Sequence, residues 1–218
     1  MIEYLERGHA AFPVGRIRAV PGPCPDCARS IRRRLAGHAA GTRSWAGCTV
    51  TDVTSSASKA GWRDLERGAP EIARLGMARL AATRVAMLGT LRSDGSPRIS
   101  PIEPHIVGGH VLVGAMTWSK KAHDLLRDPR YVLHSAVSGP DNGEGELKLH
   151  GSAVKATPGL RADAADAWWS VLPPEQAAVF SLRIATALFV EWNIEHGLMT
   201  IHRWSPWDGY SNTTRGYP

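Results

Sequence analysis

The spacing of apolar residues changes along the chain and separates a helical region from a region of strands. From residue 59 to about residue 82, apolar side chains recur at helical intervals, beginning with Trp62 and Leu65. Gly68-Ala69-Pro70 interrupts this pattern, because glycine and proline disfavour a helix interior. The pattern therefore predicts an amphipathic helical region with a break at these three residues.

After residue 83 the apolar positions follow the period of strands. The turn sequence Ser93-Asp94-Gly95-Ser96 predicts a hairpin between the first two strands. Pro101 and Pro104 place the second strand at a sheet edge or a bulge, because proline cannot donate to a ladder. The five runs that predict strands are residues 84–91, 98–104, 110–116, 131–137 and 146–154.

The remaining residues complete the expected architecture. Residues 160–180 read as helical with an interruption at residues 172–174, and residues 205–218 read as a turn-rich tail. Two closing strands are expected between them, at residues 183–192 and 198–204. Six or seven strands, mostly joined by hairpins, predict a mainly β fold with flanking helices. In a chain of 218 residues, this number favours a closed antiparallel barrel.

A short helix between the third and fourth strands carries the candidate chemistry. Ser119 suits its N-cap, and Asp128-Pro129 ends it. Lys120 and Lys121 fall in its first turn, where free backbone N–H groups and the helix dipole favour an anion. Lysines at this end oppose the dipole, and a bound phosphate would resolve the conflict. The alternative is a solvated helix start whose lysines point into water.

Composition and charge exclude several classes of protein. The chain is 43% hydrophobic, which is enough for a sizeable core, but it has no run of 18 apolar residues that would span a membrane. The first ten residues include Glu3 and Glu6 and lack the apolar centre of a secretory signal, so a cytoplasmic protein is expected. Of the net charge of +6, +4 falls within residues 1–57. The basic balance is therefore poor evidence for nucleic-acid binding.

Residues 1–57 differ in composition from the rest of the chain. Prolines break the first part, and Gly, Arg, Ser and Thr fill much of the remainder, which predicts a disordered or non-native extension with Val53 as an alternative start. All three cysteines lie here, and an odd number argues against a disulfide framework. The alternative is a zinc or partner-binding module built on Cys24, Cys27, Cys48 and His38.

An ordered set of motifs resembles one known family. The motifs are Leu88-Gly89-Thr90-Leu91, Asp94-Gly95-Ser96-Pro97, Arg98-Ile99-Ser100-Pro101, Thr117-Trp118-Ser119-Lys120-Lys121-Ala122 and Leu126-Arg127-Asp128-Pro129-Arg130. In this order they resemble the pyridoxamine 5′-phosphate oxidase-like flavin-binding split barrels, which are grouped with the flavin/deazaflavin oxidoreductases. The resemblance covers residues 60–204. It implies that residues 58–204 form an antiparallel split β-barrel that binds FMN.

The resemblance also implies which residues contact the cofactor. Family members hold the FMN phosphate at the helix start, which here is Ser119, Lys120 and Lys121. They also use neighbouring residues of the second strand, which here are Arg98, Ile99 and Ser100. The residues that end the third strand flank the ring system or the ribityl chain, and here these are Met116, Thr117 and Trp118.

The resemblance further implies a homodimer with the cofactor at the subunit interface. The sequence also favours a dimer. Trp168, Trp169 and Trp192 add more large apolar side chains than a small barrel interior can hold, which predicts an apolar interface. One departure is Glu146, which stands where the oxidases often carry glutamine. A carboxylate there would be repelled by a phosphate or flavin unless it were paired.

The residues by themselves leave simpler interpretations open. Arg98 could form a salt bridge with Asp94 in the turn, and Trp118 could pack in the barrel. The scattered histidines lack the close pairing of metal ligands, so no metal site is expected. No arrangement typical of nucleophilic catalysis stands out. Catalytic residues therefore stay unassigned, which suits a family whose cofactor performs the redox chemistry.

Two functions follow from these observations. The first is an oxidoreductase that transfers a hydride to or from a small organic substrate, with FMN as the cofactor and the deazaflavin F420 as the alternative. The second is a non-catalytic protein that binds, stores or senses flavin, F420 or haem on the same fold. Haem is the least favoured of the three cofactors.

Overall fold

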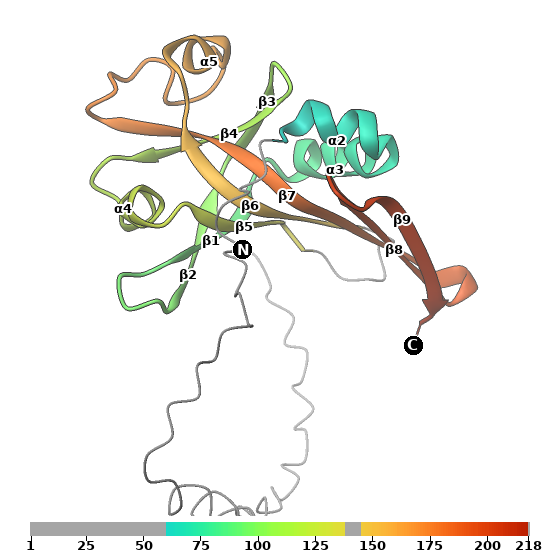
Figure 1. Ribbon diagram of the computed structural model, residues 1–218. Coiled ribbons are helices and arrows are strands. Elements are labelled where there is room, and N and C mark those ends of the chain that lie inside the picture. The colour runs from blue at the N-terminus through green and yellow to red at the C-terminus, as the bar shows by residue number, and fades with distance from the viewer. Residues whose placement is uncertain (1–59, 138–144, 218) are drawn as a thin grey trace, which may run out of the picture. The chain divides into compact units, whose positions relative to one another are not determined.

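The computed structural model describes residues 60–137 and 145–217 (Figure 1). The predictions for residues 1–57, including Cys24, Cys27, His38 and Cys48, fall outside the described residues. The helices are α2 (Trp62–Gly68), α3 (Pro70–Thr83), α4 (Lys120–Arg127) and α5 (Pro158–Asp163), with a 3-10 turn η2 (Ile194–His196). The strands are β1 (Ala86–Leu91), β2 (Pro97–Ile102), β3 (Pro104–Val107), β4 (His110–Met116), β5 (Arg130–Ser135), β6 (Glu146–Lys155), β7 (Ala177–Asn193), β8 (Leu198–Ser205) and β9 (Gly209–Gly216).

The strands form one antiparallel sheet in the order β2-β1-β5-β6-β7-β4-β3, and β8 and β9 extend it from β7. Its two ends, β2 and β3, follow one another along the chain with only Glu103 between them. The described ladders do not join β2 to β3, so the sheet curls toward closure without closing. The fold is a split barrel rather than the closed barrel that the strand count favoured.

Helices α2 and α3 supply much of the core. Trp62, Leu65 and Ile72 are fully buried and belong to the same apolar cluster as Leu88 and Leu147 of the sheet. The break between the two helices falls where the sequence predicted it, with Pro70 at the start of α3. Proline is favoured at this position because its missing N–H would have no partner there.

The predicted helix at residues 160–180 is wrong except for the short α5. The rest of this segment consists of turns, and β7 begins at Ala177 and runs for 17 residues. The Arg161 guanidinium holds the turns together, because it donates to the carbonyls of Trp169, Leu172 and Ala177 at 2.9, 2.5 and 2.8 Å. A long-range contact of this kind leaves no periodic signal in the sequence.

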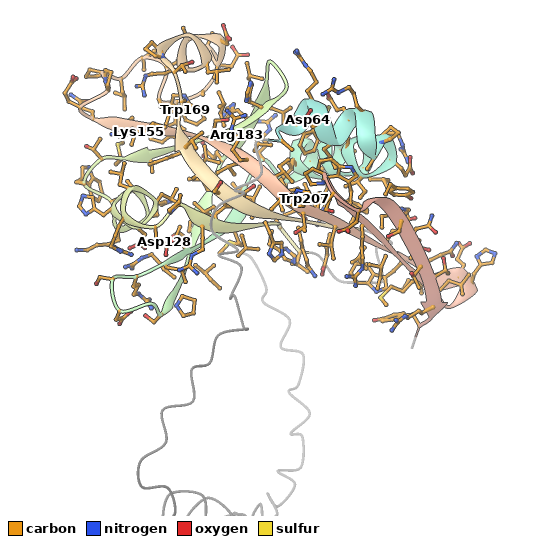
Figure 2. All side chains as sticks on the ribbon, in the orientation of Figure 1. Asp64, Asp128, Lys155, Trp169, Arg183 and Trp207 are labelled. Atoms are coloured by element: carbon orange, nitrogen blue, oxygen red, sulfur yellow. The ribbon has the colours of Figure 1, made fainter. Side chains whose placement is uncertain are left out.

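Trp169 anchors these turns from inside the fold (Figure 2). Its side chain is fully buried, and it lies in a second apolar cluster with Leu112 and Val179. A methyl group on Gly114 of β4 would come within 2.2 Å of the indole ring. Glycine at that position therefore lets the tryptophan pack directly on the strand.

Strand β9 occupies residues for which the sequence predicted a turn-rich tail. It pairs with β8 along its whole length, from Ser205 with Gly209 to Leu198 with Gly216. All eight of its residues are exposed, so the strand has no buried face and no alternation of apolar residues. No helix among the described residues is long and apolar enough to cross a membrane.

Candidate functional site

The start of α4 has the geometry that the sequence predicted. Ser119 has an extended backbone, and its hydroxyl accepts a hydrogen bond from the Ala122 N–H at 3.4 Å. The backbone N–H groups of Lys120 and Lys121 find no acceptor among the described residues. The start of α4 therefore combines two free N–H groups, the positive end of the helix dipole and the side chains of both lysines.

Strand β2 lies against this helix and is tied to it by two polar contacts. The Lys121 ammonium donates to the carbonyl of Pro101 at 2.5 Å, and the Arg98 Nε donates to an Asp124 oxygen at 2.6 Å. Burial lowers the pKa of Lys121, and nearby Glu103 partly offsets that effect. Arg98 and Lys121, which the sequence placed in one site, therefore come from neighbouring elements.

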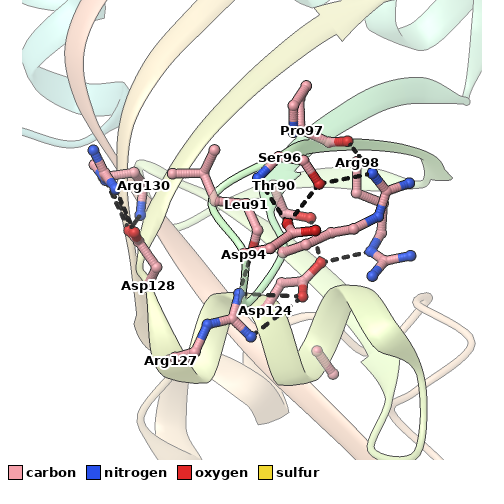
Figure 3. A network of polar contacts seen from close by, with 12 residues as sticks. Thr90, Leu91, Asp94, Ser96, Pro97, Arg98, Asp124, Arg127, Asp128 and Arg130 are labelled. Atoms are coloured by element: carbon pink, nitrogen blue, oxygen red, sulfur yellow. Dashed lines mark hydrogen bonds and ion pairs between the residues drawn. The ribbon is translucent and has the colours of Figure 1, made fainter.

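Asp124 is the centre of this contact, and the sequence analysis did not identify it (Figure 3). Its carboxylate is 4% exposed and accepts from the Thr90 hydroxyl at 2.9 Å, from Arg98, and from Arg127 at 3.4 Å. Burial alone would raise the pKa of Asp124, but hydrogen bonds from Arg98 and Thr90 outweigh it, and the pKa is lowered. Asp124 could have been found from the sequence as an acidic residue next to the apolar Leu125, on the face of the helix that is buried.

The Arg98–Asp94 salt bridge, left open by the sequence, does not form. Asp94 instead accepts hydrogen bonds from the backbone and hydroxyl of Ser96, at 2.9 and 2.6 Å, and closes its own turn (Figure 3). Arg98 uses only its Nε toward Asp124, and its two terminal nitrogens bond to no described residue. The Lys120 ammonium also has no partner among the described residues. The terminal nitrogens of Arg98 and the Lys120 ammonium are therefore free donors for an anion.

The other predicted cofactor residues differ in their contacts and exposure. Thr117 is engaged in holding the fold, because its hydroxyl donates to the Glu175 carbonyl at 2.7 Å and its N–H to Gln176. Trp118 and Ile99 are 76% and 70% exposed, so Trp118 does not pack in the barrel. Met116 at the end of β4 is also exposed, at 36%, whereas Ser100 is half-buried on β2.

Glu146 is paired, which removes the conflict that the sequence raised. Its carboxylate lies 2.8 Å from the Lys148 ammonium and 3.5 Å from the His134 Nε2. Lys148 and His134 are direct partners in the β5–β6 ladder. The carboxylate is therefore balanced by a cation on its own strand and an imidazole on the next strand.

The tryptophans that predicted a dimer interface are not an exposed patch. Trp169 is fully buried, and Trp168 packs its ring edge against Trp169 at 5.7 Å between centroids. Trp192 is half-buried and packs against Tyr217. Three of the predicted cofactor residues, Ile99, Trp118 and Met116, are instead exposed apolar side chains.

Comparison with known proteins gives similarities of fold alone. No protein-family model and no curated protein matches the chain. A pyridoxamine 5′-phosphate oxidase-related FMN-binding protein from Nostoc punctiforme has a TM-score of 0.49 at 11% identity, over 68% of this chain and 96% of that chain. PhzG from Burkholderia lata, in complex with tetrahydrophenazine-1-carboxylic acid, has a TM-score of 0.49 at 16% identity, over 66% and 88%. A heme-binding protein from Mycobacterium smegmatis has a TM-score of 0.48 at 15% identity, over 68% and 89%.

The chain resembles the pyridoxamine 5′-phosphate oxidase-like split barrels. Proteins described as pyridoxamine 5′-phosphate oxidase-related recur among the similar solved structures, together with the heme-binding protein. These likenesses have low identity and TM-scores below 0.5. The assignment of a function to the α4 site therefore rests on its own residues and geometry.

Proposed function

We propose that the start of α4 binds the phosphate of a flavin-type cofactor, and that the protein is an oxidoreductase that transfers a hydride to or from a small organic substrate. The observation that carries the proposal is the set of donors left free there. These are the N–H groups of Lys120 and Lys121, the Lys120 ammonium and the terminal nitrogens of Arg98. Such donors match the several oxygens and the double charge of a phosphate monoester.

The residues present fit FMN. Lys120, Lys121 and Arg98 would hold the phosphate, with the Ser119 cap fixing the direction of the free N–H groups. The exposed side chains of Ile99, Met116 and Trp118 offer apolar surface for the ribityl chain and ring system. When bound, the flavin would supply the hydride acceptor, and the protein would position it. F420, which also carries a phosphate group, is the alternative, and haem is a third candidate.

The exposed apolar residues favour a homodimer in which the cofactor lies at the subunit interface. Trp118 and Ile99 are too exposed to shelter a flavin ring within one subunit. Large apolar side chains exposed beside a ligand site are typical of an interface. A second copy of the chain would cover them and exclude water from one side of the ring.

A non-catalytic binding protein is the second candidate. Each contact named above holds a cofactor, and none of these residues acts on a substrate. Asp124, the buried acid of the site, already accepts from Thr90 and two arginines and has no free role in proton transfer. The same site would therefore serve a protein that stores or senses the cofactor.

The experiment that separates these functions has two stages. The absorbance spectrum of the purified protein, before and after incubation with FMN, F420 or haem, identifies the cofactor by its flavin, deazaflavin or Soret band. The loaded protein is then reduced anaerobically and mixed with menadione as a hydride acceptor. An enzyme should reoxidise about tenfold or more faster than free reduced cofactor, because it orients the acceptor. Reoxidation no faster than the free cofactor would refute the oxidoreductase, and binding of none of the three cofactors would refute both functions.

A further inference from the structure

A cavity of about 650 Å³ is lined by the end of α3 and by strand β3 with the residue before it, Glu103. Figure 1 shows these two elements. Its apolar wall includes Met77, Leu80 and Ile106. Its polar lining comes from Arg84, Glu103 and His105. Small-molecule sites have this size and this combination of an apolar wall with a few polar groups.

Arg84 occupies a position where glycine is preferred. It caps the C-terminus of α3 with φ 57° and ψ −18°, in the left-handed region, and its N–H donates to the Leu80 carbonyl at 2.8 Å. Among the described residues, it is the only non-glycine residue with a positive φ. A side chain kept at a strained backbone position points to a role for that side chain. The guanidinium forms no hydrogen bond or ion pair with a described residue.

Glu103 supplies the opposite charge in the lining of the cavity. It lies between β2 and β3, is exposed, and its carboxylate forms no hydrogen bond or ion pair with the described residues. Arg84 and Glu103 therefore line one cavity without pairing with each other. Two charges of opposite sign that line one cavity without pairing with each other complement a ligand that carries both charges.

His105 adds a neutral polar group to the lining. Its ring packs its edge against Trp169 at 4.6 Å between centroids, which fixes its orientation. Burial lowers the pKa of His105, and Glu103 and Asp166 only partly offset this, so the imidazole is uncharged at neutral pH. The cavity thus has one cation, one anion and one neutral hydrogen-bonding group over an apolar floor.

We propose that the α3–β3 cavity binds a small zwitterion with an apolar body, whose carboxylate meets Arg84 and whose ammonium meets Glu103. This inference rests on the cavity alone and does not depend on cofactor binding at α4. An amino acid with an aromatic or branched side chain has the required chemistry. Arg84 suits the carboxylate because its guanidinium fork can donate two parallel hydrogen bonds.

Isothermal titration of the full chain with three related probes tests this proposal. L-phenylalanine carries both charges, 3-phenylpropionate lacks the ammonium, and 2-phenylethylamine lacks the carboxylate. L-phenylalanine should bind saturably, and each single-charge probe should bind about tenfold more weakly, since one charge-assisted contact is lost. Absence of saturable binding, or equal affinity for the three probes, would overturn the proposal.

Variants separate the two walls. Arg84→Gln should weaken L-phenylalanine and 3-phenylpropionate but not 2-phenylethylamine, and Glu103→Gln should weaken only the two probes that carry an ammonium. Matched controls are Arg203→Gln and Glu195→Gln, both at exposed positions that do not line the cavity. These control variants should leave the affinity for all three probes unchanged. Arg84→Gly should raise the melting temperature, because glycine relieves the positive φ, and should still lose binding. Equal effects of the cavity and control variants would contradict the proposal.

Discussion

Replacing Asp124 with asparagine tests the buried network that joins α4 to the sheet. Asparagine keeps the shape of the side chain but removes its charge and turns one oxygen into an N–H donor. Thr90 and Arg98 donate to the same Asp124 oxygen, at 2.9 and 2.6 Å, so an asparagine oxygen there keeps both contacts only as a neutral acceptor, and the new N–H groups face the Arg127 guanidinium. Both hydrogen bonds therefore lose their charged acceptor, and Arg98, 23% exposed, loses its counter-charge.

The expected loss follows from the burial of this site. A hydrogen bond to a charged group contributes about 1.5–3 kcal/mol. The contact from Arg127 is longer and more exposed, so it adds little. We therefore expect Asp124→Asn to lower the free energy of unfolding by about 2–3 kcal/mol at neutral pH, and Asp124→Ala by about 3–5 kcal/mol.

The same substitution predicts a pH dependence with a definite sign. The folded-state pKa of Asp124 lies below its unfolded value, so the carboxylate contributes its full stability above the unfolded pKa. That contribution is lost as the pH falls through the lowered folded-state pKa. The difference between the wild type and Asp124→Asn should therefore be largest near neutral pH and should shrink in acid.

Urea denaturation at several pH values measures both effects. Asp128→Asn is the matched control, because Asp128 lies four residues further on but pairs with the exposed Arg130. It should cost much less than Asp124→Asn. A loss for Asp124→Asn that is no larger than the control, or that does not change with pH, would refute the role given to the network.

Three further predictions concern the anion site, the oligomer and the N-terminal residues. Lys120→Ala with Lys121→Ala should weaken FMN binding about a hundredfold or more in fluorescence titration and leave the circular dichroism spectrum unchanged; unchanged affinity would contradict the anion site. Sedimentation at micromolar concentration should show a dimer, and Ile99→Asp with Trp118→Asp should give monomers, because both charges would be buried in the proposed interface; a wild-type monomer would argue against it. Deleting the residues before Val53 should leave the melting temperature and the FMN affinity unchanged, and the full chain should hold no stoichiometric zinc. One equivalent of zinc per full chain would support a metal-binding module instead.

The local elements with strong sequence signals were predictable. The helix-breaking Gly68-Ala69-Pro70, the hairpin at residues 93–96 and the Ser119 cap each act within a few residues of the chain, so sequence spacing alone locates them. The mainly β fold also followed, because apolar alternation marks strands that bury one face, whereas the split in the barrel was implied only by the family resemblance. Strand β9 has no buried face, so its residues show no apolar alternation from which its pairing with β8 could be predicted.

The errors concern contacts between distant residues. The helical reading of residues 160–180 failed because Arg161 satisfies three carbonyls of a turn segment, which no periodicity reveals. The pairing of Arg98 with Asp124 spans 26 positions and depends on how α4 packs against β2. The sequence identified the cations of the candidate site, and only the structure showed which of their nitrogens stay free.

The central claim is that α4 recognises a phosphate, and comparing FMN with riboflavin tests it most directly. The two molecules share the ring and the ribityl chain, and riboflavin lacks only the phosphate. Fluorescence titration of the wild type should give an affinity for FMN about a hundredfold higher than for riboflavin, and Lys120→Ala with Lys121→Ala should remove most of that difference. Equal affinity of the wild type for FMN and riboflavin would contradict the account.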